Sequence, residues 1–273
     1  RTVTPIPLGE SCAWDPGLWE ETARMSAAEA AAGGIHMTFA PMVDVAKDAR
    51  WGRISEGAGE DSLLNAAYGE AKVRGFQGKD LKEPDTLAAC VKHFAGYGAV
   101  ESGRDYNRVD MSMQRLYEEY LEPYRACVEA GVSAVMPAFN DINGVPCTVN
   151  EWLLQDVLRK DWKFNGMTVS DANAIAECVE HGIVGDREDA AANALHAGVD
   201  MDMTSDCYSE NLEALIRSGK VAETDLDRAV TNILRTKMKL GLFEHPYRTD
   251  EEKEKRTILK PEFRELALRS AEE

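Results

Sequence analysis

Short apolar segments alternate with segments of helical periodicity along most of the chain, and this alternation constrains the fold more than any other feature. The apolar segments are near-continuous hydrophobic runs, as expected for strands that are buried on both faces. The short links between them indicate parallel strands joined by helical crossovers. The expected strands cover residues 35–39, 86–94, 132–139, 167–170 and 199–203, and the expected helices cover residues 61–76, 111–130, 150–162, 187–197, 209–218 and 223–240.

Two α/β architectures fit this order of elements, a doubly wound sheet and a (β/α)8 barrel of the TIM type. Polar residues stand at the ends of several expected strands, and a closed ring would bring all those ends to one mouth. We therefore predict a β/α barrel over residues 1–245. Residues 246–273 depart from the alternation and carry a mixed charged tract at 250–256, which favours a solvated linker.

The composition bounds the class of protein and its partners. A chain of 273 residues, 44% of them hydrophobic, is long enough for the core of one large domain. No apolar run is long enough to span a bilayer, so no membrane partner is expected. The formal net charge of −17 would repel a phosphate backbone, which argues against nucleic acid as a partner. A homo-oligomer is one further partner that the composition allows.

The six cysteines contain no CxxC pair, which indicates buried thiols rather than a disulfide framework. Free thiols slightly favour the cytoplasm over the periplasm or secretion. The five histidines are not grouped with Cys or Asp at the spacing of metal ligands. Neither a metal nor another cofactor is therefore expected.

The stretch 166–175 places one carboxylate at the end of an expected buried strand. The apolar run ends at Asp171, and helix-forming residues follow at once. In β/α barrels the chemistry lies at this edge, because the loops there converge. Asp171 could serve as a nucleophile, a general base or a metal ligand, or it could simply cap the following helix.

Other expected strands also end in polar residues. Lys92 and His93 lie near the end of one strand, and Arg53 lies in a charged, Gly-rich turn at 50–61. Each has a structural alternative: Lys92 as a surface lysine, His93 as a core histidine, and Arg53 paired with a neighbouring glutamate. For Asp202 we expect a structural role, either capping the helix that begins near residue 209 or holding the Met-rich turn.

Together these side chains describe a small pocket that is rich in donors around one carboxylate. Such a pocket suits a carbohydrate, because sugar hydroxyls need many directed hydrogen bonds. The cations Lys92 and Arg53 would keep Asp171 ionised, so that it could attack an anomeric carbon. A rival reading is an aldolase-like barrel in which Lys92 forms a Schiff base.

The chain resembles glycoside hydrolase family 3, most closely its bacterial β-glucosidases. Matching segments occur in the family's order over nearly all of residues 3–245, and the combination is specific where any one piece is not. They include Ala40-Pro41-Met42-Val43-Asp44-Val45, Arg50-Trp51-Gly52-Arg53, Val91-Lys92-His93-Phe94, Asn107-Arg108-Val109-Asp110-Met111-Ser112, Asn143-Gly144-Val145-Pro146, Val169-Ser170-Asp171, Ala197-Gly198-Val199-Asp200-Met201-Asp202-Met203 and Gly241-Leu242-Phe243.

The resemblance implies a role for each matching position. Asp171 corresponds to the catalytic nucleophile of a retaining exo-β-glycosidase acting on terminal β-D-glucosyl residues. Arg53, Lys92 and His93 correspond to residues that hold the terminal sugar. Phe139, where some relatives carry a tyrosine, and Met203 are further candidates for substrate contact. Ala172 stands where relatives often have Trp or His.

The resemblance also implies what the chain lacks. Members of the family begin their barrel with an earlier strand, and most take the acid/base glutamate from a second α/β domain. The other family solution, a histidine in the loop after the Lys-His strand, is absent from residues 95–107. The expectation is an incomplete barrel without its first strand, with residues 246–273 leading to an absent second domain that would carry the acid/base residue. Missing segments of the same polypeptide are then its partners, besides β-glucosides or β-linked oligosaccharides. A β-xylosidase or a non-catalytic sugar-binding barrel stays an alternative.

Overall fold

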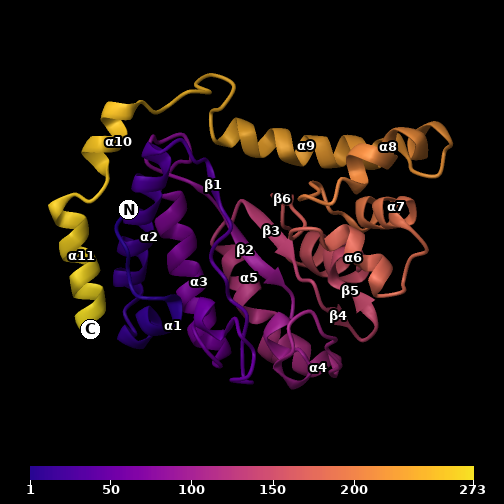
Figure 1. Ribbon diagram of the computed structural model, residues 1–273, viewed down its shortest axis with the longest axis horizontal. Coiled ribbons are helices and arrows are strands. Elements are labelled where there is room, and N and C mark those ends of the chain that lie inside the picture. Colours follow the sequence, from indigo (N-terminus) through magenta and orange to yellow (C-terminus); the bar gives the residue numbers. More distant parts are fainter.

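A computed structural model describes residues 1–273, and its centre is a parallel sheet (Figure 1). The strands follow the order β1 (Met37–Thr38), β2 (Ala88–Phe94), β3 (Ala134–Pro137) and β6 (Met167–Thr168). Cys90 pairs with Ala134, and Ala134 in turn pairs with Met167. The carboxyl ends of β2, β3 and β6 therefore point to the same edge of the sheet.

The α/β class and the parallel strands that the sequence predicts are confirmed, but a closed barrel is not seen. The sheet has four strands, and β1 and β6 lie at its two edges. The strand expected at 199–203 is reduced to a single bridge between Val169 and Met201. Residues 35–39 contribute only the two residues of β1.

Two helices precede the sheet, and the sequence analysis did not predict them. They are α1 (Pro7–Glu10) and α2 (Pro16–Ala32). The Asp15 side chain accepts hydrogen bonds from the backbone N–H groups of Gly17 and Leu18, which caps α2. Helix α2 then packs along α3 (Ser62–Gln77), a helix that Asp61 caps in the same way.

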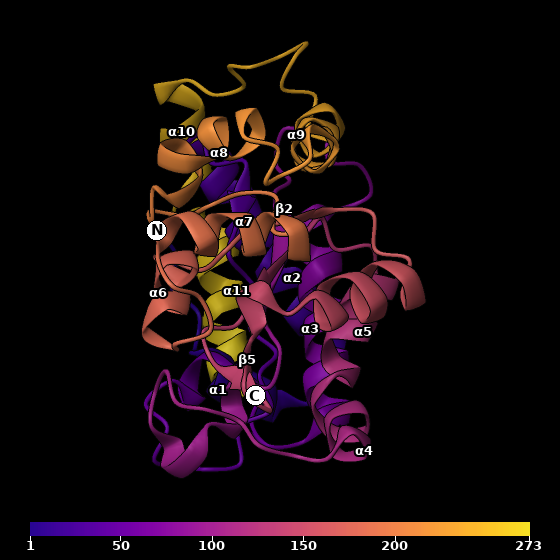
Figure 2. The ribbon, with the colours of Figure 1, turned by 90° about the vertical axis from the view of Figure 1, so that its right-hand side faces the viewer.

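The helices between and after the strands follow the predicted order. The predicted helix 111–130 is broken into α4 (Met113–Arg115), a π-helical turn at Leu116–Tyr120 and α5 (Glu122–Glu129). A hairpin of β4 (Asp141–Ile142) and β5 (Val145–Pro146) follows β3. The remaining elements are a π-helical segment at Trp152–Asp161, α6 (Ala174–Glu180), α7 (Arg187–Ala197), α8 (Cys207–Arg217) and α9 (Glu223–Lys239). Helices α6, α7 and α8 cover the end that faces the viewer in Figure 2.

A buried polar cluster ties α1, α2 and α3 together. Lys72 Nζ lies 2.6 Å from Glu10 Oε2, and both side chains are almost fully buried. Tyr68 donates to the same carboxylate at 2.8 Å, and Lys72 also donates to Thr22 Oγ1 at 2.9 Å. Burial lowers the pKa of Lys72 although Glu10 opposes this. Because the charge is compensated, the cluster fixes the register of the three helices.

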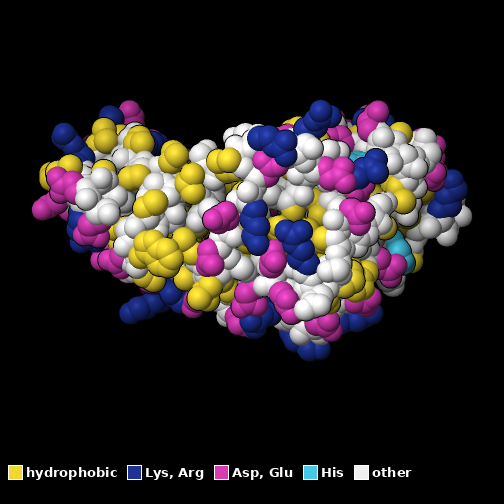
Figure 3. Space-filling model, turned by 90° about the horizontal axis from the view of Figure 1, so that it is seen from below, with side chains coloured by type: hydrophobic (Ala, Val, Ile, Leu, Met, Phe, Trp, Pro, Cys, Tyr) yellow, Lys and Arg dark blue, Asp and Glu magenta, His cyan; other side chains and the backbone are white.

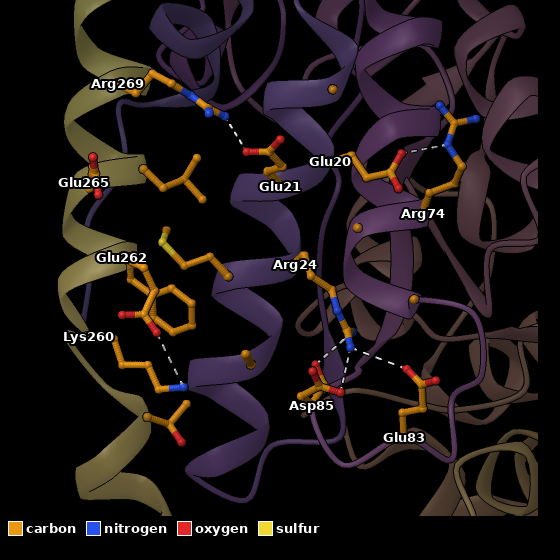
Figure 4. A pocket seen from close by; sticks show the side chains of 18 of the residues that line it. Glu20, Glu21, Arg24, Arg74, Glu83, Asp85, Lys260, Glu262, Glu265 and Arg269 are labelled. Carbon is orange, nitrogen blue, oxygen red and sulfur yellow. Dashed lines mark hydrogen bonds and ion pairs between the residues drawn. The ribbon is translucent and has the colours of Figure 1, made fainter.

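Residues 246–273 contain two helices, α10 (Glu251–Thr257) and α11 (Pro261–Glu272). The charged tract that the sequence analysis interpreted as a linker is thus helical. Helix α11 lies beside α2, where Arg269 pairs with Glu21 across a groove of about 1520 Å³ (Figure 4). That the segment leads to a second domain stays a prediction.

All six cysteines are free, as the sequence predicts. Five of them are buried, but Cys12 is exposed, so the prediction of buried thiols fails at that position. None of the helices combines the length and the apolar character that crossing a membrane requires.

The close contact between α2 and α3 predicts the effect of a substitution at Gly75. A Cβ there would lie 2.4 Å from the backbone oxygen of Glu20 and 2.6 Å from Ala23 Cβ. Gly75→Ala is expected to lower the free energy of unfolding by about 1–3 kcal/mol, despite the better helix propensity of alanine. Urea denaturation measures the change.

Gly9→Ala is the matched control, since a Cβ at Gly9 would make only ordinary contacts, the nearest at 3.7 Å. If Gly75→Ala were as stable as this control, the packing of α2 against α3 described above would be wrong.

Candidate active site

Strand β2 places Lys92 and His93 at its carboxyl end. His93 is fully buried, whereas the side chain of Lys92 is 18% exposed. Lys92 Nζ lies 3.8 Å from Glu56 Oε2, which makes Glu56 its charged partner. Lys92 is therefore not the surface lysine of its structural alternative, whereas the burial of His93 agrees with the alternative of a core histidine.

Asp171 follows β6 and reaches the same place. Its Oδ2 lies 3.4 Å from His93 Nε2, and its side chain is 14% exposed. Its Oδ1 accepts a hydrogen bond from the backbone N–H of Ala172 at 2.7 Å. The carboxylate is therefore held at the edge of the sheet but stays open to solvent on one side.

Arg53 links the Gly-rich loop to this pair. Its guanidinium forms two hydrogen bonds with Glu56, at 2.8 and 3.1 Å, so the expected pairing with a neighbouring glutamate is confirmed. Its Nη2 also lies 3.1 Å from His93 Nε2. Burial alone would lower the pKa of Arg53, but the hydrogen bond and the charge of Glu56 together have a larger effect and raise it. Burial alone would raise the pKa of Glu56, but the hydrogen bond and the charge of Arg53 together have a larger effect and lower it.

Asp44 fixes the orientation and the tautomer of His93. Its Oδ2 lies 2.7 Å from His93 Nδ1 and also accepts from the His93 backbone N–H at 3.1 Å. A carboxylate only accepts, so the proton of the neutral ring sits on Nδ1. The Nε2 lone pair is then free to accept from Arg53. Nε2 carries no proton in this tautomer, so the Asp171 carboxylate, which only accepts, lies 3.4 Å from it without a hydrogen bond.

Tyr124 completes this buried chain from α5. Its hydroxyl lies 2.7 Å from Asp44 Oδ1 and 2.6 Å from the main-chain oxygen of His93. Burial, and then the charge of Asp44, raise the pKa of Tyr124 well above its usual range. The sequence analysis assigned no role to Asp44 or Tyr124. The only signal for Asp44 was its position within a segment that matches the family, and Tyr124 had none.

Aromatic rings form the wall beside His93. Tyr97 packs edge-on against His93 with ring centres 5.2 Å apart, and Arg53 lies over Tyr97 at 5.5 Å. Phe139 packs against Tyr97 at 5.8 Å and against Tyr106 at 4.8 Å. Phe139 is thus part of this wall, and its contact with a substrate stays a prediction. Tyr97 and Tyr106 were not singled out in the sequence.

Met203 and Asp202 directly follow the single bridge that Met201 forms with Val169. The backbone N–H of Met203 donates to Ser170 Oγ at 2.8 Å, which brings Met203 next to the residue before Asp171. Asp202 accepts from Ser205 Oγ at 2.5 Å and from the Tyr208 backbone N–H at 3.1 Å. The structural role that we expected for Asp202, at the start of α8, is confirmed.

The four predicted residues Arg53, Lys92, His93 and Asp171 thus meet in one place, although they come from three distant parts of the chain. Figure 3 views the molecule from below, where Lys and Arg side chains lie close to Asp and Glu side chains around a hollowed area. Such an arrangement combines one accessible carboxylate with several directed donors, as a polyhydroxylated ligand requires.

Comparison with known proteins identifies the family. The chain matches the glycosyl hydrolase family 3 N-terminal domain over residues 1–236. It therefore belongs to this family, and the resemblance seen in the sequence is confirmed.

Two curated relatives illustrate the range of activities. The chain is 51% identical to the periplasmic beta-glucosidase of Salmonella typhimurium over 247 residues, which cover 90% of this chain and 32% of that protein. It is 39% identical to a beta-xylosidase of Formosa agariphila, covering 99% of this chain and 39% of that protein. The chain thus spans well under half the length of these relatives.

A solved relative has the same fold. The beta-glucosidase of Listeria innocua, in complex with glucose, superposes with a TM-score of 0.96 at 45% sequence identity, over 99% of this chain and 38% of that one. A mutant of the same enzyme was solved with laminaribiose.

The contacts of Asp44 predict the consequence of removing its charge. Asp44→Asn is expected to release His93 from the Nδ1–H tautomer and to lower the free energy of unfolding by about 1–3 kcal/mol, because a buried hydrogen-bond network loses its acceptor. Imidazole ¹⁵N NMR measures the tautomer, and urea denaturation measures stability. Tyr124→Phe keeps the carboxylate on Nδ1 and should leave the tautomer unchanged; an identical ¹⁵N pattern in Asp44→Asn and the wild type would contradict the assignment.

Proposed function

We propose that the chain carries the nucleophile and the sugar-holding groups of a retaining exo-β-glycosidase that releases terminal non-reducing β-D-glucosyl residues. The observation that carries this proposal is the place of Asp171, 3.4 Å from His93 Nε2, the atom that Arg53 Nη2 also contacts at 3.1 Å. Membership of the family supports it. It also removes the aldolase-like reading of Lys92.

In the proposed reaction an Asp171 carboxylate oxygen forms a bond to the anomeric carbon. The bond from that carbon to the leaving oxygen breaks, and the leaving oxygen takes a proton from a general acid. Water then attacks the same carbon, the Asp171 ester breaks, and the proton of the water returns to the general acid. Configuration is retained because each of the two displacements inverts the anomeric carbon.

Two other carboxylates in the site, Asp44 and Glu56, already have hydrogen-bond partners. Asp44 is buried beneath His93, and Glu56 is bound to Arg53. We therefore propose that the acid/base glutamate lies outside residues 1–273, in the part of the protein that the longer relatives have in addition. We also propose that the parallel sheet of residues 1–245 is part of a (β/α)8 barrel. Residues 246–273 would then link this barrel to a second domain.

Arg53, Lys92 and His93 are proposed to bind hydroxyl groups of the terminal sugar, and Phe139 and Met203 to contact its apolar faces. The substrates are then β-glucosides or β-linked oligosaccharides. A β-xylosidase is the second candidate, favoured by the identity with the Formosa agariphila enzyme across almost the whole chain. A non-catalytic sugar-binding domain would bind glucose in calorimetry, and the full-length protein would show no turnover.

Mechanism-based labelling tests the nucleophile. Incubating the full-length protein with 2-deoxy-2-fluoro-β-D-glucosyl fluoride should leave a fluoroglucosyl ester on Asp171, detected by peptide mass spectrometry. Asp171→Asn should lose the label and lower kcat on the order of 10⁴-fold or more, as for other nucleophiles. Asp202→Asn is the control, because Asp202 only supports α8, and it should keep the label. A label on any other residue ends the assignment.

Relative activity on two aryl glycosides separates the two candidates. The full-length protein should have a kcat/KM for 4-nitrophenyl β-D-glucoside at least about fivefold above that for the β-D-xyloside, since the xyloside lacks the hydroxymethyl group and one hydrogen bond, worth about 1 kcal/mol or more. A higher kcat/KM for the xyloside would favour the β-xylosidase instead.

A further inference from the structure

The Gly-rich turn that carries Arg53 is bonded mainly to itself. The main-chain N–H of Ile54 donates to the oxygen of Trp51 at 3.4 Å, and the N–H of Glu56 donates to that of Arg53 at 3.0 Å. The side chains of Arg53 and Glu56 are three residues apart, so their ion pair fixes Arg53 relative to the turn. Where the turn as a whole lies over the sheet therefore depends on how it packs against other elements.

Trp51 packs the turn against the segment that follows β2. Its side chain is almost fully buried, and its ring lies edge-on to the ring of Tyr97 at 5.1 Å. Tyr97 begins the short helical turn that comes directly after β2. The guanidinium of Arg53 lies over the same Tyr97 ring, 5.5 Å from its centre. One ring thus contacts both Trp51 and Arg53, so a shift of Trp51 would be felt at Arg53.

Asp105 holds the polar end of Trp51. The indole Nε1–H donates a hydrogen bond to Asp105 Oδ1 at 3.0 Å, across 54 residues of sequence. An indole has one donor and no acceptor, so a buried tryptophan is oriented by the group that takes this bond. Burial first, and then Asp105, raise the pKa of Tyr97, so the same carboxylate also acts on the second ring beside Arg53.

The segment that carries Asp105 lies directly on the backbone of the turn. Gly103 has a positive φ of 64°, and a Cβ there would lie 2.7 Å from the backbone nitrogen of Trp51. The segment is closed by a hydrogen bond of its own, from Asn107 Nδ2 to the main-chain oxygen of Glu101 at 3.1 Å. Asp105 is therefore presented from a fixed position, against which its bond to Trp51 can hold the turn.

We infer that Asp105 is a positioning residue for the terminal-sugar site. By accepting from the Trp51 indole it holds the turn in place, and through Trp51 and Tyr97 it sets the position of the Arg53 guanidinium. Asp105 acts through Arg53 and forms no bond to the sugar. This role rests on the proposed function, because Arg53 must bind the terminal sugar for its position to affect activity.

Three single variants test this role in the full-length protein. Asp105→Ala removes the acceptor, whereas the amide oxygen of Asp105→Asn can still accept from the indole. Asp105→Ala should raise the inhibition constant for glucose about fivefold, the effect of about one hydrogen bond. Its kcat on 4-nitrophenyl β-D-glucoside should stay within about twofold of the wild type, because the lost contact binds the ground state and the transition state alike. Asp105→Asn should behave as the wild type, and so should the matched control Asp110→Ala, at an exposed carboxylate nearby.

A double-mutant cycle tests whether the effect passes through the indole. Trp51→Phe keeps a ring but removes the N–H donor, and it should raise the inhibition constant for glucose about as much as Asp105→Ala does. The double variant should be no worse than either single variant, since all three lack the same hydrogen bond. Effects that multiply, to about 25-fold, would contradict the coupling.

A second cycle tests whether the effect ends at Arg53. In an Arg53→Lys background, assayed at higher enzyme concentration, Asp105→Ala should change the inhibition constant for glucose less than about twofold. The full fivefold change in that background would mean that Asp105 acts elsewhere, and it would overturn the positioning role.

The outcomes separate this role from the proposed function. If the wild type does not hydrolyse the aryl glucoside, the proposed function fails and the positioning role fails with it. If the wild type is active and Asp105→Ala matches Asp110→Ala, the positioning role alone is wrong. It is also wrong if Asp105→Asn is as impaired as Asp105→Ala. Urea denaturation checks that the variants are folded, and if Asp105→Ala is not, wild-type glucose inhibition in Trp51→Phe overturns the role.

Discussion

His93 Nε2 is the atom on which the arrangement of the site depends. Asp44 fixes the other side of the ring, so Nε2 has one position, between Arg53 at 3.1 Å and Asp171 at 3.4 Å. The ring cannot turn away, because Asp44 holds its Nδ1 and Tyr97 packs against its face. A buried imidazole that Asp44 holds on one side thus sets where the guanidinium and the carboxylate lie, and Arg53 donates the hydrogen bond to its Nε2.

The parallel sheet explains why these groups come together. β2 brings Lys92 and His93, and β6 brings Asp171, to the same edge, because neighbouring parallel strands end on one side. Arg53 arrives from a loop that Glu56 holds, and Tyr124 reaches Asp44 from a helix behind the sheet. Membership of glycosyl hydrolase family 3 fits this division, in which the sheet supplies rigid positions and the loops supply the groups that distinguish one member from another.

Strong local signals made some elements predictable. The helix 187–197 has the predicted bounds, since Asp186 caps its start and Gly198, with a φ of 113°, ends it. Asn150 caps the predicted helix 150–162. This helix has π geometry over Trp152–Asp161, which its sequence pattern does not distinguish from an α-helix. Helices α1, α2, α10 and α11 were not predicted; α2 contains so many alanines that its apolar face is weak.

Among the site residues, the sequence by itself determined which chemistry was present: a carboxylate, an imidazole and two cations at strand and loop ends, where the loops of parallel strands converge. Only the tertiary structure decided which of them touch. Asp44 and His93 are 49 residues apart, and Tyr124 reaches Asp44 over 80 residues. No local pattern records such contacts, since they depend on how the strands are ordered and how the helices pack over them.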